Sequence, residues 1–199
     1  MNIKPILFNT EMVRAILEGR KTQTRRILKT RHGGKLEIHD DPGGVTRLCE
    51  KSGSVCHGLI PPYEAGDILW VRETFLNCFG NRFLYKADDY DGAIDRAFIQ
   101  QGWNWKPSIH MPKEAVRIFL KVKDVRIEKL WAMDEEAAIA EGFEDSPAGT
   151  DSPLQRFSEL WDKTIKRDDL REFGYHADPW VWVVEFERCE KPEGWCVDE

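Results

Sequence analysis

The sequence of 199 residues contains no apolar run that approaches the roughly 20 residues needed to span a bilayer. No segment resembles a signal peptide, because the opening stretch MNIKPILFNTEMV lacks a long apolar region. The five cysteines are an odd set without regular spacing, which is typical of a reducing compartment, and we expect Cys189 and Cys196 to be free thiols. We therefore expect a cytoplasmic protein with no membrane partner.

The common signatures of phosphate, dinucleotide and metal sites are also missing. The glycine pairs at 33–34 and 43–44 lack the strand-then-helix context that a phosphate-binding loop requires. The cysteines and histidines of residues 32–57 do not have the close paired spacing of a usual zinc site. These residues are His32, His39, Cys49, Cys56 and His57. We expect no metal and no cofactor.

The basic residues are unevenly distributed. The net charge is −6, so the chain as a whole does not have the basic character typical of nucleic-acid-binding proteins. Between Arg14 and Lys35, however, eight Lys and Arg residues stand against a single acidic residue, Glu18. This pattern indicates either a defined anion site or a solvated basic face, and charge alone does not separate the two.

The first 28 residues predict a strand, a helix and a second strand. The apolar stretch MNIKPILF is typical of a strand, and either Asn9 or Thr10 caps the helix that follows. Gly19 is placed to end this helix, and TQTRRIL begins the next strand.

Periodicity in the rest of the chain predicts more strands and two helices. We expect strands at Ile68–Arg72, 81–88, 115–130 and 179–188, with 81–88 pairing with Ile68–Arg72, and helices at 133–143 and 153–165. Residues 30–62 and 88–114 are rich in glycine, proline or tryptophan, and we expect insertions with little regular structure. Together these elements predict one α+β domain over residues 1–199, a small closed or nearly closed barrel with peripheral helices.

The stretch GRKTQTRR, residues 19–26, carries the strongest chemical signal. A threonine hydroxyl such as that of Thr24 is a nucleophile when a base lies within hydrogen-bond reach. Lys21 could be that base, because neighbouring arginines and desolvation lower the pKa of a lysine. Residues three apart lie on opposite faces of a strand, so Lys21 and Thr24 converge only if Lys21 still lies in the turn after Gly19.

The segment ILEGRKTQTRRI resembles the signature of ASCH-domain proteins, which belong to the PUA-like superfamily and have a compact β-barrel. Their pattern Gly-x-Lys-x-x-Glu-x-Arg is matched by Gly19, Lys21 and Arg26, with Thr24 in place of the glutamate. N4-acetylcytidine amidohydrolases, a bacterial branch of the superfamily, are similar here and have threonine at the same place. This resemblance implies that Lys21, Thr24 and Glu141 are catalytic, Glu141 coming from the helix segment MDEEAAIAEGF.

A second resemblance covers nearly the whole chain. The stretches GDILWVRETF, WKPSIHMPKEAVRI, AIAEGF and PWVWVVEFER are similar to a group of phage and prophage ASCH-like proteins of unassigned function. The chain is much longer than the amidohydrolases, and residues 30–62 and 88–114 have no clear counterpart in them. Similarity of fold alone does not transfer an activity.

Within the basic segment we expect Gly19 and Arg26 to bind substrate, and further candidates for substrate binding lie outside it. Arg72 and Glu73 end an apolar strand and either line the cleft or form a surface ion pair. Aromatic residues beside a cation can stack a base and hold a phosphate, although such a loop can equally cap a barrel. In WNWKPSIHMP the candidates are Trp105, Lys106, Ser108 and His110.

These observations lead to three hypotheses. The first is recognition of a nucleoside, nucleotide or RNA base in a central cleft, with hydrolysis of an N-acylated cytosine such as N4-acetylcytidine as its most specific form. The cleft would be lined by Lys21, Thr24, Arg26, Arg72, Glu73 and Glu141. The second is a non-catalytic RNA- or DNA-binding module, and the third is a ribonuclease with His110 or Lys21 in acid–base roles.

Overall fold

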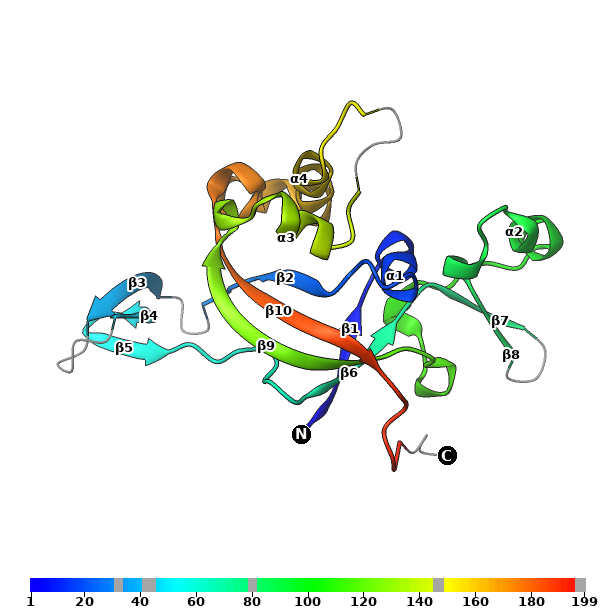
Figure 1. The fold of residues 1–199 in the computed structure, drawn as a ribbon, viewed down its shortest axis with the longest axis horizontal. Helices are drawn as coiled ribbons and strands as arrows, with labels where there is room; N and C mark the ends of the chain where they lie inside the picture. Colours follow the sequence, from blue (N-terminus) through cyan, green and yellow to red (C-terminus); the bar gives the residue numbers. More distant parts are fainter. Residues whose placement is uncertain (31–33, 41–45, 79–81, 145–148, 196–199) are drawn as a thin grey trace.

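The computed structural model describes residues 1–30, 34–40, 46–78, 82–144 and 149–195. Its fold is a mixed α+β arrangement, in which a curved sheet is accompanied by short helices and two smaller sheets (Figure 1). No helix in these ranges is both long and apolar enough to cross a membrane.

The main sheet has five strands in the order β1-β6-β9-β10-β2. Their bounds are β1 Ile3–Leu7, β2 Gln23–Ile27, β6 Ile68–Arg72, β9 Phe119–Lys129 and β10 Trp180–Cys189. The pair β1–β6 is parallel and the other neighbours are antiparallel. The long strands β9 and β10 bend strongly, so that the sheet curves around one side of the molecule (Figure 1).

The expected closed barrel is not found among the described residues. The strands β1 and β2 are the two edges of the main sheet, and no backbone ladder joins them in the described part of the chain. Their link is a side chain, because Arg26 Nη2 on β2 donates to the carbonyl oxygen of Leu7 on β1 at 3.1 Å. The sheet is therefore open, with its edges drawn together at one end.

The described part of the chain has five α-helices, with the bounds α1 Thr10–Leu17, α2 Ala93–Phe98, α3 Glu135–Ala140, α4 Pro153–Thr164 and α5 Leu170–Phe173. Of these, α1, α3 and α4 pack against the main sheet, and α2 lies apart from it (Figure 1). Asn9 caps α1, as one of the two predicted alternatives, by accepting from the Met12 N–H at 2.8 Å. Asp134 caps α3 in the same way, and Ser152 begins α4 with a capping box that includes Gln155.

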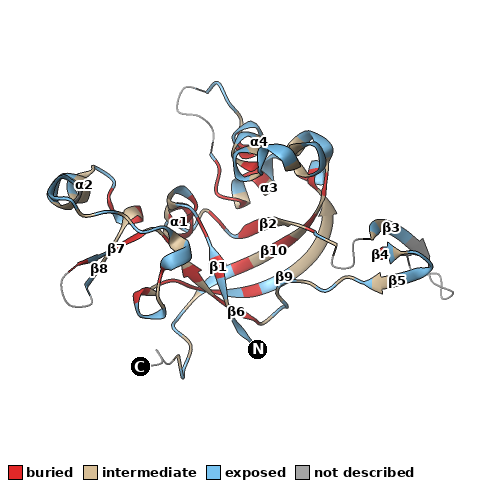
Figure 2. Ribbon diagram, turned by 180° about the vertical axis from the view of Figure 1, so that it is seen from behind, coloured by how far each residue is buried: buried red, intermediate tan, exposed pale blue. Residues whose placement is uncertain are grey.

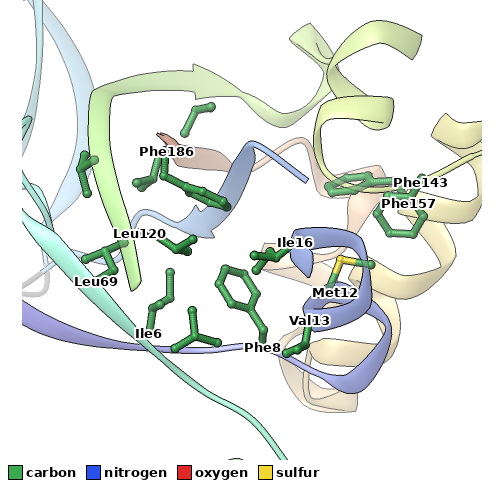
Figure 3. Packing of buried hydrophobic residues seen from close by; sticks show 14 of the residues in the cluster. Ile6, Phe8, Met12, Val13, Ile16, Leu69, Leu120, Phe143, Phe157 and Phe186 are labelled. Atoms are coloured by element: carbon green, nitrogen blue, oxygen red, sulfur yellow. The ribbon is translucent and has the colours of Figure 1, made fainter. Parts of the chain in front are cut away.

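The hydrophobic core lies between the concave face of the main sheet and helices α1, α3 and α4. Buried residues are concentrated along the sheet and on the helices beside it (Figure 2). Figure 3 shows Phe8 and Ile16 beside the sheet residues, and Phe143 and Phe157 beside α4. One continuous core therefore holds the helices against the open end of the sheet.

Residues 30–62 contain more regular structure than expected. A separate three-stranded antiparallel sheet is formed by β3 Lys35–Asp40, β4 Thr46–Ser52 and β5 Val55–Gly58. This small sheet extends away from the main sheet (Figure 1). Cys49 and Cys56 form a disulfide across it, which was not expected from the odd cysteine count. Cys78 and Cys189 are free thiols, and Cys196 lies outside the described residues.

The predicted partner of Ile68–Arg72 is also different in the structure. Strand β8 (Arg82–Tyr85) pairs with β7 (Phe75–Cys78) in a hairpin of its own, whereas β6 lies between β1 and β9. The chain leaves the main sheet after Arg72, so the next strands along the sequence do not continue it. Residues 88–114, expected to be irregular, include the helix α2.

Candidate active site

The turn between α1 and β2 determines where Lys21 points. The backbone N–H groups of Arg20 and Lys21 both donate to the carbonyl oxygen of Ala15, at 2.9 and 3.0 Å. Gly19 allows this turn by adopting a φ of 79°, a left-handed conformation that favours glycine. Lys21 therefore precedes β2, which is the condition under which its side chain and that of Thr24 can converge.

Lys21 and Glu141 form a buried ion pair. Lys21 Nζ lies 2.6 Å from Glu141 Oε2 and donates to the Glu141 carbonyl oxygen at 2.8 Å. The two side chains are 1% and 5% exposed, so water screens their interaction little. Glu141 is the C-cap of α3, and the next residue, Gly142, has a φ of 99° and lies against α1 and Lys21.

Arg25 is a third charged member of this buried group. Its Nη1 lies 3.3 Å from Glu141 Oε1, and its Nη2 lies 3.4 Å from Glu128 Oε2 on β9. Glu128 is shared, because Arg126 Nε lies 2.5 Å from its other oxygen. Arg25 Nε is buried without a hydrogen-bond partner among the described residues.

Thr24 and Arg26 lie two residues apart on β2 and contact each other. Arg26 Nη1 donates to Thr24 Oγ1 at 2.8 Å and to the Arg25 carbonyl oxygen at 3.0 Å. Thr24 is only 2% exposed, so its hydroxyl is reached through the cavity rather than from the bulk surface. A guanidinium that donates to a hydroxyl oxygen stabilises that oxygen if it becomes negative.

One cavity of about 370 Å³ is lined by Lys21, Thr24, Arg25, Arg26 and Glu141. Its polar wall is formed by residues of the basic segment and by Glu141. Its apolar wall comes from the end of β1, from Met12, and from α4 and the segment before it: Leu7, Phe8, Phe143, Phe157, Leu160, Trp161 and Ile165. A volume of this size is typical of sites for small molecules, and aromatic walls suit a planar ring.

Burial controls the charges at this site. Desolvation lowers the pKa of Lys21, and the positive charges of Arg26 and Arg25 lower it further, whereas Glu141 opposes the shift. Desolvation likewise lowers the pKa of Arg26, again against the attraction of Glu141. At a given pH, a larger fraction of the Lys21 amine is therefore neutral than for a lysine on the surface.

Arg72 and Glu73 are not among the residues that line this cavity, although the sequence suggested that they would be. Glu73 is 1% exposed and accepts two hydrogen bonds from Arg117, at 2.8 and 3.0 Å. Arg117 also contacts Asp88, so Glu73 belongs to a separate ion-pair network beside the β7–β8 hairpin. The side chain of Arg72 donates to the Ile109 carbonyl oxygen.

The four candidates in WNWKPSIHMP also lie outside the cavity lining. Trp105 Nε1 donates to Asp95 Oδ1 at 2.6 Å, and the Lys106 backbone pairs with Phe75. Ser108 and His110 belong to a short 3-10 helix, and His110 is exposed. Aromatic and basic residues close together in sequence thus have separate structural contacts.

Sequence reasoning missed the apolar wall and the part played by Arg25. The helical stripe of residues 153–165 was visible in the sequence, but its spacing does not distinguish side chains that fill a core from side chains that border a cavity. Phe157 and Trp161 do both. Part of the expected basic patch is internal, because Lys21 and Arg25 are buried and Arg14 donates to three backbone carbonyl oxygens of residues 86–89, whereas Lys29 and Lys35 are exposed.

No family model matches the chain, and no curated protein matches it. A solved structure described as hypothetical protein PH0355 aligns with 95% of this chain and 100% of its own, at 13% identity and a TM-score of 0.39. A similarity this weak carries no argument about fold or function.

Proposed function

We propose that the cavity binds a nucleoside or nucleobase and that the protein hydrolyses an amide on that base, with an N-acylated cytosine such as N4-acetylcytidine as the most specific form. The main support is that Lys21, Thr24 and Glu141 lie around one cavity. These are the three positions to which the ASCH resemblance assigns catalysis. The proposal includes a PUA-like ancestry, which is compatible with a curved sheet whose edges approach each other.

In the proposed reaction, Thr24 Oγ1 attacks the carbonyl carbon of the acyl group. Its proton passes to Lys21 or Glu141, and the Arg26 guanidinium stabilises the negative charge that develops. The carbon–nitrogen bond then breaks, and the exocyclic amine of the base leaves with the proton that was taken from Thr24. Water finally releases the acyl group from Thr24 as a carboxylate, and the hydroxyl regains its proton.

Lys21 is the base that the electrostatics favour. Its pKa is lowered by burial, so a neutral amine forms closer to neutral pH than for an exposed lysine. Glu141 would then orient the amine through the 2.6 Å contact and stabilise the ammonium that results.

The alternatives have less support. The ribonuclease hypothesis relied in part on His110, which is exposed and outside the cavity lining. A non-catalytic RNA- or DNA-binding module would need cations on an accessible surface, and the side chains of Lys21 and Arg25 are each 1% exposed.

The test is to incubate the protein with N4-acetylcytidine and to follow cytidine by chromatography. We expect Thr24→Val to abolish release while binding of cytidine, measured by calorimetry, is retained. Thr22→Val is the matched control, because Thr22 is exposed on the same segment and does not line the cavity. The hydrolase proposal is overturned if the folded parent protein releases no cytidine, or if Thr24→Val remains as active as the parent.

A further inference from the structure

Arg26 is a cation of the cavity wall that Glu141 attracts at longer range, but in the described structure it makes no hydrogen bond to an anion. Among the described residues it donates only to uncharged oxygens, namely Thr24 Oγ1 and the carbonyl oxygens of Arg25 and Leu7. Its Cζ also lies 5.4 Å from the centre of the Phe8 ring, which supplies a weaker attraction. Arg26 is half-buried, and a partly desolvated guanidinium without a hydrogen-bonded counter-ion carries a cost that an anion in the cavity would offset.

The hydrogen-bonding capacity of Arg26 is also incompletely used. A guanidinium carries five N–H groups. Three of them are accounted for, two on Nη1 and one on Nη2. In the described structure, the Nε–H and the second N–H of Nη2 have no partner. Arginine binds carboxylates and phosphates through paired N–H groups of this kind.

The neighbouring carboxylates form ion pairs with other cations. Glu141 places one oxygen on Lys21 and the other on Arg25, at 2.6 and 3.3 Å. Glu128 is closer to Arg126, at 2.5 Å, than to Arg25, at 3.4 Å. Arg25 Nε is a buried N–H without a partner in the described residues. The donors at the cavity wall therefore exceed the anionic acceptors that the chain supplies there.

We propose that the cavity contains a subsite for an oxyanion, a carboxylate or phosphate group, at Arg26 beside Thr24. The assignment of the ligand rests on the proposed function. The oxyanion is either the carboxylate that hydrolysis releases or the phosphate of a bound nucleotide. In the first case the acyl product is held next to the nucleophile and inhibits the enzyme. In the second case the substrate is a nucleotide rather than a nucleoside.

The direct test is nuclear magnetic resonance of the arginine Nε–H groups of the 15N-labelled protein, with the Arg26 signal assigned through the backbone. We expect acetate or inorganic phosphate to shift the Arg26 signal saturably. Arg26→Lys, which keeps the charge and loses the paired donors, should weaken binding by about tenfold or more, measured by calorimetry. Arg20→Gln is the control for a lost charge, because Arg20 does not line the cavity and is paired with Glu18 and Glu144.

Comparison of cytidine with cytidine 5′-monophosphate identifies the source of the oxyanion. A shift with acetate and equal affinities for cytidine and cytidine 5′-monophosphate assign the subsite to the carboxylate product. At least tenfold tighter binding of the monophosphate, lost in Arg26→Lys, assigns it to the phosphate. The subsite is refuted if neither anion nor the monophosphate moves the Arg26 signal, and this outcome can be read from the parent protein even if the variant does not fold.

The same measurements separate this inference from the hydrolase proposal. Anion binding requires no turnover, so a saturable Arg26 shift in a protein that releases no cytidine keeps the subsite and removes the hydrolysis. Release of cytidine without any anion-dependent shift keeps the hydrolysis and removes the subsite.

Discussion

Lys21 is surrounded by one carboxylate and two guanidinium groups, and its environment explains why a basic segment can be internal in an acidic protein. The segment supplies a buried ion pair and two cavity-wall arginines rather than a solvated face. At this scale, the sequence supplied only a condition for the convergence of Lys21 and Thr24, namely that Lys21 lies in the turn after Gly19, and the structure meets this condition.

The pH dependence of hydrolysis tests the role of Lys21. Only the neutral amine accepts a proton, so kcat/KM should rise with pH through the Lys21 pKa, at a midpoint below the ordinary value of 10.5. In Lys21→Met this limb of the profile should disappear together with most of the activity. If kcat/KM of Lys21→Met still rises with pH, we would assign the role of base to Glu141 instead.

Gly142 is the second residue on which the site depends. A Cβ at this position would lie 2.8 Å from the Ala15 Cβ and 3.1 Å from the Lys21 Cβ, in addition to the strain of a φ of 99°. We expect Gly142→Ala to lower the free energy of unfolding by about 2–4 kcal/mol and to displace the Lys21–Glu141 pair.

Gly19→Ala is the matched control for Gly142→Ala. Gly19 has a φ of 79°, and a Cβ there has no neighbour within 4 Å, so only the strain of about 1–2 kcal/mol applies. Equal losses in the two variants, measured by urea unfolding, would contradict the close-packing explanation.

At the scale of elements, strands and helices with strong periodicity were predictable from the sequence. Which strands pair with each other in the sheet was not. The strand Ile68–Arg72 was predicted with the bounds that the structure has. Its pairing with β1, which lies more than 60 residues earlier in the sequence, leaves no local signal, whereas a hairpin with the next strand does. The small sheet β3–β5 was missed because glycines and prolines around it are equally typical of irregular loops.

Asp67 joins β1 to β6 at the start of their pairing. Burial would raise the pKa of its carboxyl, but hydrogen bonds from Lys4 and from the backbone N–H groups of Asn2 and Glu64 lower it from 3.8 to about 2. This difference corresponds to roughly 2 kcal/mol of stability that is present above pH 3.8 and is lost as the pH falls through about 2.

We therefore expect Asp67→Asn to be less stable than the parent by roughly 2 kcal/mol at pH 7, with the difference vanishing near pH 2. Urea unfolding at a series of pH values measures this, and Asp168→Asn, which removes an exposed carboxylate, is the control. A stability loss that is independent of pH would show that the charge of Asp67 is not responsible.

At the scale of the whole molecule, the small sheet β3–β5 extends away from the main sheet (Figure 1). The disulfide of the small sheet bridges residues seven apart and lies outside the cavity lining. We expect reduction, or Cys49→Ala with Cys56→Ala, to speed amide hydrogen exchange in β3–β5, while exchange in β9 and β10 and cytidine binding stay unchanged. Loss of cytidine binding on reduction would show instead that the small sheet supports the cavity.

The α+β class was predictable from the sequence at this scale, and the open sheet was not. Closure depends on whether the first and last strands of the sheet are joined by a backbone ladder. In the described structure the Arg26 side chain contacts Leu7 across this gap. A single side-chain contact of this kind leaves no periodic pattern in the sequence from which it could be predicted.

The open sheet has a mechanical consequence. Its two edge strands each supply part of the cavity wall, and β6, β9 and β10 lie between them. A small change in twist between each pair of neighbours adds up across the sheet, so the width of the cavity follows the curvature of all five strands. For the proposed ligand, the elastic stiffness of the sheet would therefore contribute to the affinity. Substitutions in the middle of β9, which does not line the cavity, would then alter binding by changing the equilibrium curvature of the sheet.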